Sequence, residues 1–289
     1  METQTLNLTD LICDSLNSIF SKFFSSIDNT TYSVLDDILF LDSSIISEPK
    51  FQQLFGTDST NGLLLLANSL IFGVVLFYII KFALSHLIYS KIDSPYQFIF
   101  KCIIFICCMN SSFWICEKIL DLTKLISDGI CEIGFSITGS QISFSGLMDK
   151  INSALYLSPE TFSIFSFDGI LKLFTTLGIL YILLTYSVRF IMGKLLILLA
   201  PFAFLALINN QFDGFFKTWL KQFLMTLSMQ IFVAIVLVLG FSLDFSLGDT
   251  LSKLLYFAII AVITKSNFSM RDFFAEMFQY SQNKLKDFV

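Results

Sequence analysis

The chain has 289 residues, of which 55% are hydrophobic and only 14% are charged, and its 35 phenylalanines raise the aromatic share to 16%. Its mean hydropathy of +0.76 lies well outside the range of soluble domains. These values exclude an ordinary soluble enzyme and indicate a polytopic membrane protein, in which the distribution of charge matters more than the net charge of −5.

The N-terminal region, residues 1–61, is acidic and contains no run long enough to cross a membrane. It holds nine carboxylates but only two lysines. Between Leu11 and Ile27 the apolar residues recur at helical spacing, which predicts an amphipathic helix. Such a helix packs on its own protein, lies in a membrane interface or binds a partner, and these alternatives remain open.

Two spans are predicted in residues 62–116. Gly62–Ile80 contains no charge, and the second span, Tyr96–Cys116, carries Lys101 near one end, where its stem can reach the headgroups. Residues 117–169 are polar again, with seven carboxylates and three lysines. They predict a sizeable extracytoplasmic loop region that begins with an amphipathic helix.

The membrane core is predicted in residues 170–264. Its three spans are expected at Leu171–Phe190, Phe223–Phe241 and Leu254–Ile263. Between the first two of these, the apolar segment Leu195–Ile208 is short and contains Pro201, which removes a backbone donor. A segment of this length is more often re-entrant, interfacial or buried than spanning. The expected fold is therefore all-α, with about five transmembrane helices, one Pro-broken segment and amphipathic flanking helices.

The basic residues set the expected orientation. Ten of them fall on one side of the membrane, in residues 81–95, 189–222 and 264–289, against six on the other side. The positive-inside rule then places the N-terminus outside and the C-terminus in the cytoplasm. Residues 265–289 are expected to form a cytoplasmic amphipathic tail.

No sequence motif of a catalytic, nucleotide-binding or metal site occurs in the chain, so we expect a protein without enzymatic activity, cofactor or metal. The six cysteines show no repeated CxxC spacing, and the chain has one histidine as a further metal ligand. The cysteines are therefore expected to pack as small apolar residues. A disulfide between Cys13 and Cys131 remains an alternative. No carboxylate falls within an assigned span, whereas an ion-coupled transporter usually needs one.

Seven residues are candidates for packing or partner contacts. Four of them are small or helix-breaking and favour close helix contact, namely Gly193, Ala200, Pro201 and Ala203. Trp219 stands before the fourth span, at the position of an interfacial anchor. Lys217 and Lys221 flank it, and they serve as topology signals at lipid headgroups or contact a partner subunit or the phosphates of DNA.

The segment Arg189–Gly240 resembles the corresponding region of the TrbL-like polytopic membrane subunits of type IV secretion and conjugation machines. In both, a basic span end precedes an apolar LAP element, here Leu199–Pro201. A short polar break, Asn209–Gly214, then leads to a W-x3-F element, here Trp219 with Phe223. The predicted five-span plan with its large outer loop extends the likeness to most of the chain.

The resemblance implies a subunit without enzymatic activity that oligomerises with its own copies and with other secretion subunits, including ATPases. Such a subunit lies among the lipids of the bacterial cytoplasmic (inner) membrane, contributes to the route of DNA or protein out of the cytoplasm and contacts that substrate transiently. A scaffold that does not line the path and a small-solute channel or permease are the alternatives. The permease ranks last, because only one half of the chain shows a broken helix.

Overall fold

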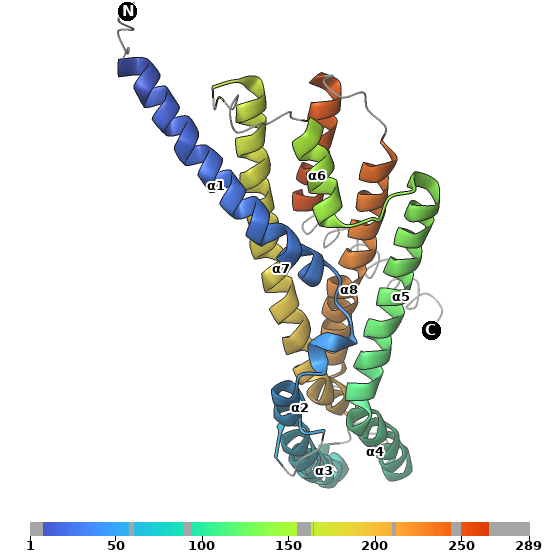
Figure 1. The fold of residues 1–289 in the computed structure, drawn as a ribbon. Coiled ribbons are helices and arrows are strands. Elements are labelled where there is room, and N and C mark those ends of the chain that lie inside the picture. Colours follow the sequence, from blue (N-terminus) through green and yellow to red (C-terminus); the bar gives the residue numbers. More distant parts are fainter. Residues whose placement is uncertain are drawn as a thin grey trace, which may run out of the picture. The chain divides into compact units, whose positions relative to one another are not determined.

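The computed structural model describes residues 8–57, 61–88, 94–154, 163, 165–209, 212–243 and 250–265 (Figure 1). Regular structure in these residues is helical throughout, with no strand among them, which confirms the all-α prediction. The helices are α1 (Leu8–Leu39), the short 3₁₀ helix η1 (Ser43–Ile46), α2 (Pro49–Phe55), α3 (Leu63–Ile88), α4 (Pro95–Asn110), α5 (Ser112–Thr138), α6 (Phe144–Ala154), α7 (Phe167–Ala206) and α8 (Asp213–Ser242). Residues 250–265 form a further helix.

Three helices in the described residues are long and apolar enough to cross a membrane. They are α3 over Leu63–Ser85, α7 and α8. The helices α4 and α5 meet at an angle of 59° and make a fourth candidate if the bent pair crosses as one span. These helices are compatible with the predicted membrane protein.

The helix α7 differs from the sequence prediction in its length. The third span was expected to end at Phe190, before a separate segment at residues 195–208, but α7 continues to Ala206 with Pro201 inside it. Proline removes one donor, while every other backbone group in an apolar environment is best satisfied by continuing the helix. At 1.5 Å per residue α7 is about 60 Å long, roughly twice the thickness of the hydrocarbon core.

The predicted second span is divided between two helices. Ser94 and Gln97 form a capping box that starts α4, and the helix ends at Asn110. The backbone N–H of Ser111 donates to the Cys107 carbonyl, and α5 begins at the next residue. The helix α5 then runs through the predicted amphipathic segment, so much of the polar region after residue 117 is helical. The predicted tail lies outside the described residues from 266 onward.

The chain forms two compact units. Unit 1 comprises residues 1–40, 126–188 and 229–280, and unit 2 comprises 41–125, 189–228 and 281–289. The helices α5, α7 and α8 therefore contribute residues to both units. The fully buried apolar side chains of unit 1 include Leu35, Leu39, Phe144, Leu147, Ile179, Ile182, Val233 and Leu237. Those of unit 2 include Leu41, Phe55, Ala67, Met109, Cys116, Ile197, Ala200, Ala203 and Phe223.

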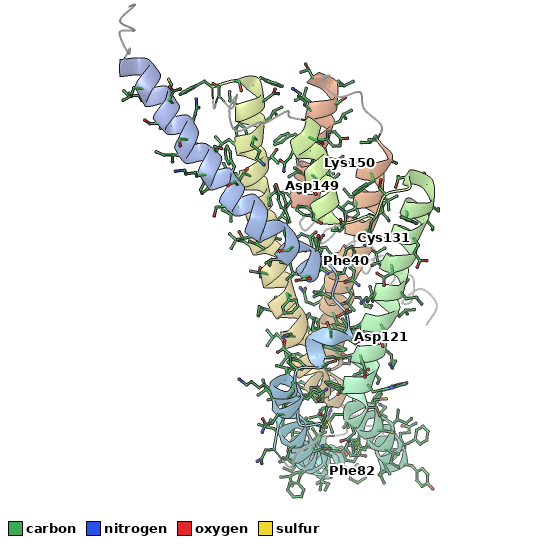
Figure 2. The ribbon with its side chains drawn as sticks, in the orientation of Figure 1. Phe40, Phe82, Asp121, Cys131, Asp149 and Lys150 are labelled. Atoms are coloured by element: carbon green, nitrogen blue, oxygen red, sulfur yellow. The ribbon has the colours of Figure 1, made fainter. Side chains whose placement is uncertain are left out.

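Within unit 1, α6 is held by polar contacts from two other helices. It lies against α1 (Figure 1), where the Asp36 carboxylate accepts the backbone N–H groups of Phe144 at 2.7 Å and Ser145 at 3.3 Å. A carboxylate at this helix end satisfies free donors and opposes the helix dipole. Lys150, labelled in Figure 2, donates to the Phe241 carbonyl at 3.3 Å and lies 4.8 Å from the ring centroid.

Candidate partner-contact site

In unit 2, Trp219 connects the C-terminal part of α7 to the start of α8. Its side chain is only 4% exposed, so it is a buried packing residue and not the interfacial anchor that the sequence suggested. The indole N–H donates to the Leu196 carbonyl at 2.7 Å. This carbonyl is next to that of Ile197, whose intrahelical donor is missing because Pro201 has no N–H. The tryptophan thus adds a hydrogen bond where the backbone of α7 is weakest.

Aromatic rings surround this hydrogen bond. Phe223, one turn further along α8, stacks on Trp219 with centroids 5.4 Å apart and planes at 8°. Phe204 from α7 and Phe216 from α8 each lie 5.7 Å from the indole. Aromatic pairs at these separations contribute beyond the area they bury. The W-x3-F element therefore packs as one cluster with α7.

The small residues of α7 lie where the sequence predicted close packing. Ala200 and Ala203 are fully buried in the same apolar cluster as Trp219, and Pro201 is buried too. A Cβ added at Gly193 would lie 3.5 Å from the Leu41 side chain, an ordinary contact. Buried alanines let helices approach closely, and a larger side chain has no room to replace them.

The two candidate lysines of α8 differ in their exposure. Lys217 forms an ion pair with Asp213, one turn earlier, at 2.7 Å, and both side chains are exposed. Lys221 is partly buried. Since exposed i,i+4 pairs contribute little to stability, Lys217 can exchange its partner at small cost. The structure brings Ala200, Pro201, Ala203 and Trp219 into one cluster, and leaves Lys217 at the surface.

Two further cations of α7 belong to this part of unit 2. The Lys194 ammonium pairs with Glu48 at 2.7 Å and lies 5.0 Å from the Phe190 ring centroid. Arg189 is only 6% exposed. Arg189 and Lys194 are the basic residues that precede the LAP element, but no sequence pattern indicates the contact of Lys194 with Glu48, which is 146 positions away.

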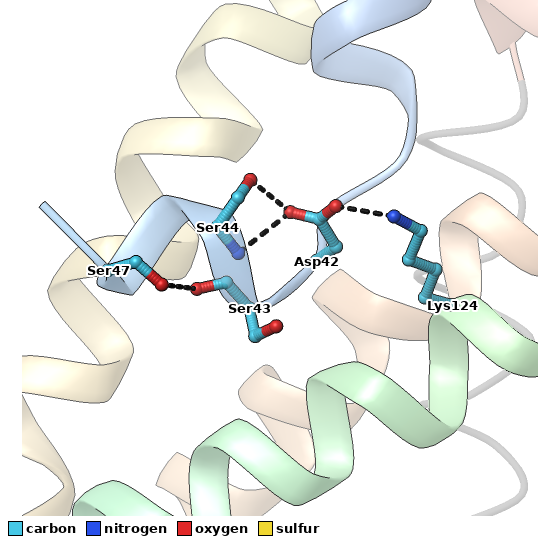
Figure 3. A network of polar contacts seen from close by, with 5 residues as sticks. All are labelled: Asp42, Ser43, Ser44, Ser47 and Lys124. Atoms are coloured by element: carbon cyan, nitrogen blue, oxygen red, sulfur yellow. Dashed lines mark hydrogen bonds and ion pairs between the residues drawn. The ribbon is translucent and has the colours of Figure 1, made fainter.

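The segment between α1 and α2 is fixed on α5 by a polar network (Figure 3). Asp42 accepts the Ser44 backbone N–H and its hydroxyl, and also the Lys124 ammonium at 2.6 Å. The Ser47 hydroxyl donates to the Ser43 carbonyl at 2.9 Å. Partial burial acts to raise the pKa of Asp42, but the bonds from Lys124 and Ser44 outweigh it and hold the pKa below its usual 3.8.

The helices α3 and α4 of unit 2 contact each other through a polar pair and an aromatic pair. Asn68 and Asn110 exchange amide hydrogen bonds of 3.1 and 3.4 Å. Tyr78 stacks on Phe98 with centroids 3.6 Å apart and planes at 4°. The order of the two contacts is reversed along the two helices, so they run antiparallel. Sequence reasoning missed both contacts, although an asparagine in an apolar helix is itself a signal for a polar contact between helices.

Within the described residues, no group of three or more histidine, cysteine or carboxylate side chains is placed to hold a metal ion. Each of the six cysteines is a free thiol, so the alternative of a disulfide between Cys13 and Cys131 is not seen. The polar contacts described above are structural in kind. They join helices, cap helix ends and pair opposite charges, and none of them presents a nucleophile beside a base.

The comparisons with known proteins give no relative from which to transfer a function. No protein-family model matches this sequence, and none of the curated proteins is significantly similar to it. The likeness to TrbL-like subunits therefore remains a prediction from the residues of Arg189–Gly240.

Proposed function

We propose that this chain is an integral membrane subunit of a type IV secretion or conjugation machine, related to the TrbL-like subunits, that contributes to the path of DNA or protein out of the cytoplasm. The support comes from the α7–α8 contact of unit 2. The LAP element and the W-x3-F element, which carry the resemblance, lie in one buried cluster joined by the Trp219 hydrogen bond. The energy for transport would come from partner ATPases.

The proposal includes five spans, with the N-terminus outside and the C-terminus in the cytoplasm. Residues 195–208 would not cross the bilayer again. They would extend α7 beyond its span, with their apolar side chains covered by protein. The support is the burial of Ala200 and Ala203 together with the excess of basic residues on the same side.

Cysteine labelling in a cysteine-free background tests this topology. Asp37 and Ser136 are both exposed, so D37C and S136C should react with an impermeant maleimide from outside. K217C should react only after permeabilisation. Labelling of K217C in intact cells would contradict the five-span arrangement.

Gene deletion tests the function. Loss of the chain should abolish conjugative transfer, while the ATPase activity of isolated partner subunits stays measurable. A permease would instead change solute uptake and leave transfer intact, and undiminished transfer in the deletion strain would refute the secretion role.

The two lysines of α8 separate a contact role from a topology role. The double variant K217E/K221E should reduce transfer if these residues meet a partner subunit or DNA, whose phosphate contacts weaken with salt. K217E places a second carboxylate next to Asp213, which introduces repulsion within α8. The variant D213K/K217E is the control, because it keeps an i,i+4 pair of opposite charges. K118E on α5 is a control for an exposed lysine elsewhere. If K217E/K221E accumulates and inserts correctly and transfer is undiminished, Lys217 and Lys221 act as topology signals only.

A scaffold that does not line the path is the second candidate, and one observation favours it. Only 6% of the most apolar part of α3 is buried, and α4 exposes Ile99, Phe100 and Ile103. An apolar surface of this extent faces lipid or other subunits. Crosslinking from α3 and α4 in the assembled machine would reach partner subunits in a scaffold, and translocating substrate in a channel.

A further inference from the structure

In unit 1, α7 and the helix of residues 250–265 lie against each other in parallel. The Lys253 ammonium pairs with Asp168 at 2.8 Å, and the rings of Phe174 and Phe257 have centroids 6.4 Å apart. Further along both helices, a Cβ added at Gly178 would lie 3.1 Å from the Ile260 side chain. The missing side chain at Gly178 therefore permits the close approach of the two helices.

A groove of about 510 Å³ follows this contact. Its walls are apolar along most of its length, with Phe174 and Phe257 at one end. At the other end lie Tyr181, Thr264 and Lys265. An open apolar groove that ends in hydroxyl groups and a cation has the polarity of a phospholipid, whose acyl chain is apolar and whose phosphate is anionic.

The two lysines of this helix differ in their partners. Lys253 is mostly buried and paired with Asp168. Lys265 is exposed, and it makes no ion pair or hydrogen bond within the part of the chain that the structure describes. The Thr264 hydroxyl already donates to the Ile260 carbonyl at 2.8 Å. The ammonium of Lys265 is thus the available charge at the polar end of the groove.

We propose that this groove is a binding site for an anionic phospholipid, with an acyl chain along α7 and the phosphate at Lys265. Bulk lipid is as apolar as the groove, so the acyl chain supplies position and not selectivity. Selectivity comes from the charge-assisted bond between ammonium and phosphate, for which a single basic residue favours an anionic over a zwitterionic lipid by about fivefold. The inference requires a membrane-embedded chain and does not depend on the secretion role.

Native mass spectrometry of the detergent-purified protein tests the charge. Titration with dioleoyl phosphatidylglycerol and with dioleoyl phosphatidylcholine should show tighter retention of the former by about fivefold. K265Q should remove this preference, whereas K118Q, an exposed lysine on α5, should keep it. Equal retention of the two lipids by the unaltered protein would overturn the proposal, as would a preference that survives K265Q.

A second pair of variants tests the groove itself. Ala261 and Val262 are neighbouring exposed residues, and only Ala261 lines the groove. A261F should fill the groove and reduce retention of phosphatidylglycerol several-fold, and V262F should leave it unchanged. Neither substitution changes a buried side chain of the helix, and circular dichroism and thermal unfolding check that both variants remain folded. Equal retention in both variants, or equal loss in both, would place the lipid elsewhere and refute the site.

Discussion

The helices α3 and α8 have the same apolar character but very different surroundings. In α3 only 6% of the most apolar stretch is buried, against 56% in α8. The exposed residues of α3 include Phe72 at 76%, and a Cβ added at Gly73 would meet nothing within 4 Å. In α8, by contrast, Thr226 and Gln230 are buried. Buried polar side chains, and not hydropathy, distinguish the helix that packs in protein.

The physical reason for this difference is the weakness of the hydrophobic effect between helices in a membrane. Lipid tails are as apolar as leucine, so a helix is drawn into a bundle by close packing and by hydrogen bonds. The helix α8 offers both, because Phe223 and Val233 are fully buried and the Trp219 indole donates to the Leu196 carbonyl. The described contacts of α3 cover less of the helix and include the Asn68 pair, the Tyr78 stack and the buried Ala67. Three changes test this contrast between a packed and an open helix, and a fourth tests a polar contact elsewhere in unit 2.

The largest effect is expected at Trp219. W219A removes a buried ring and its hydrogen bond, which should lower the free energy of unfolding by about 3–5 kcal/mol. W219F keeps a ring but loses the indole donor, so a smaller loss is expected. Trp114 on α5 is 60% exposed, and W114A is the matched control. Thermal unfolding in detergent measures all three, and similar losses in W219A and W114A would contradict the assigned packing.

Overpacking at Ala203 should have the next largest effect. A203F forces a large side chain into a fully buried position, which should cost about 1–3 kcal/mol or more and disturb assembly. G73F makes a comparable change on the open face of α3 and should leave monomer stability unchanged. Size-exclusion chromatography and unfolding measure both variants, and a neutral A203F would show that α7 is not tightly packed.

The amide pair between α3 and α4 should contribute less to the free energy of unfolding. A double-mutant cycle with N68L and N110L is expected to give a coupling energy of about 0.6–2 kcal/mol, as found for hydrogen bonds between membrane helices. Each asparagine takes part in both hydrogen bonds, so each single variant should remove both bonds. A coupling near zero would mean that lipid or water satisfies the amides equally well.

The smallest effect is expected at Asp42. Its pKa is lower in the folded chain than its usual 3.8, so its contribution to stability is complete above about pH 4 and is lost as the pH falls through the folded-state pKa. The pair with Lys124 is partly exposed, which limits the contribution to a few tenths of a kcal/mol. D42N should remove this part of the pH dependence below pH 4. An unchanged acid transition in D42N would contradict the assignment.

The apolar runs of the sequence were sufficient to predict an all-helical chain with helices long and apolar enough to cross a membrane, because hydropathy and helical periodicity are local properties. The amphipathic character of the N-terminal region and of α5 was predicted for the same reason. Ala200 and Ala203, which the sequence singled out as candidates for close helix contact, are buried. In these cases the residue types alone carry the physical constraint.

The tertiary structure decided where helices end and which faces are covered. Pro201 suggested a break, but the buried surroundings of α7 kept the helix continuous. Trp219 suggested an interface, and only the fold brought the Leu196 carbonyl within reach of its indole. The pairs of Asp42 with Lys124 and of Lys194 with Glu48 join residues far apart in the chain. No local pattern encodes such contacts, because they exist only once the helices have packed.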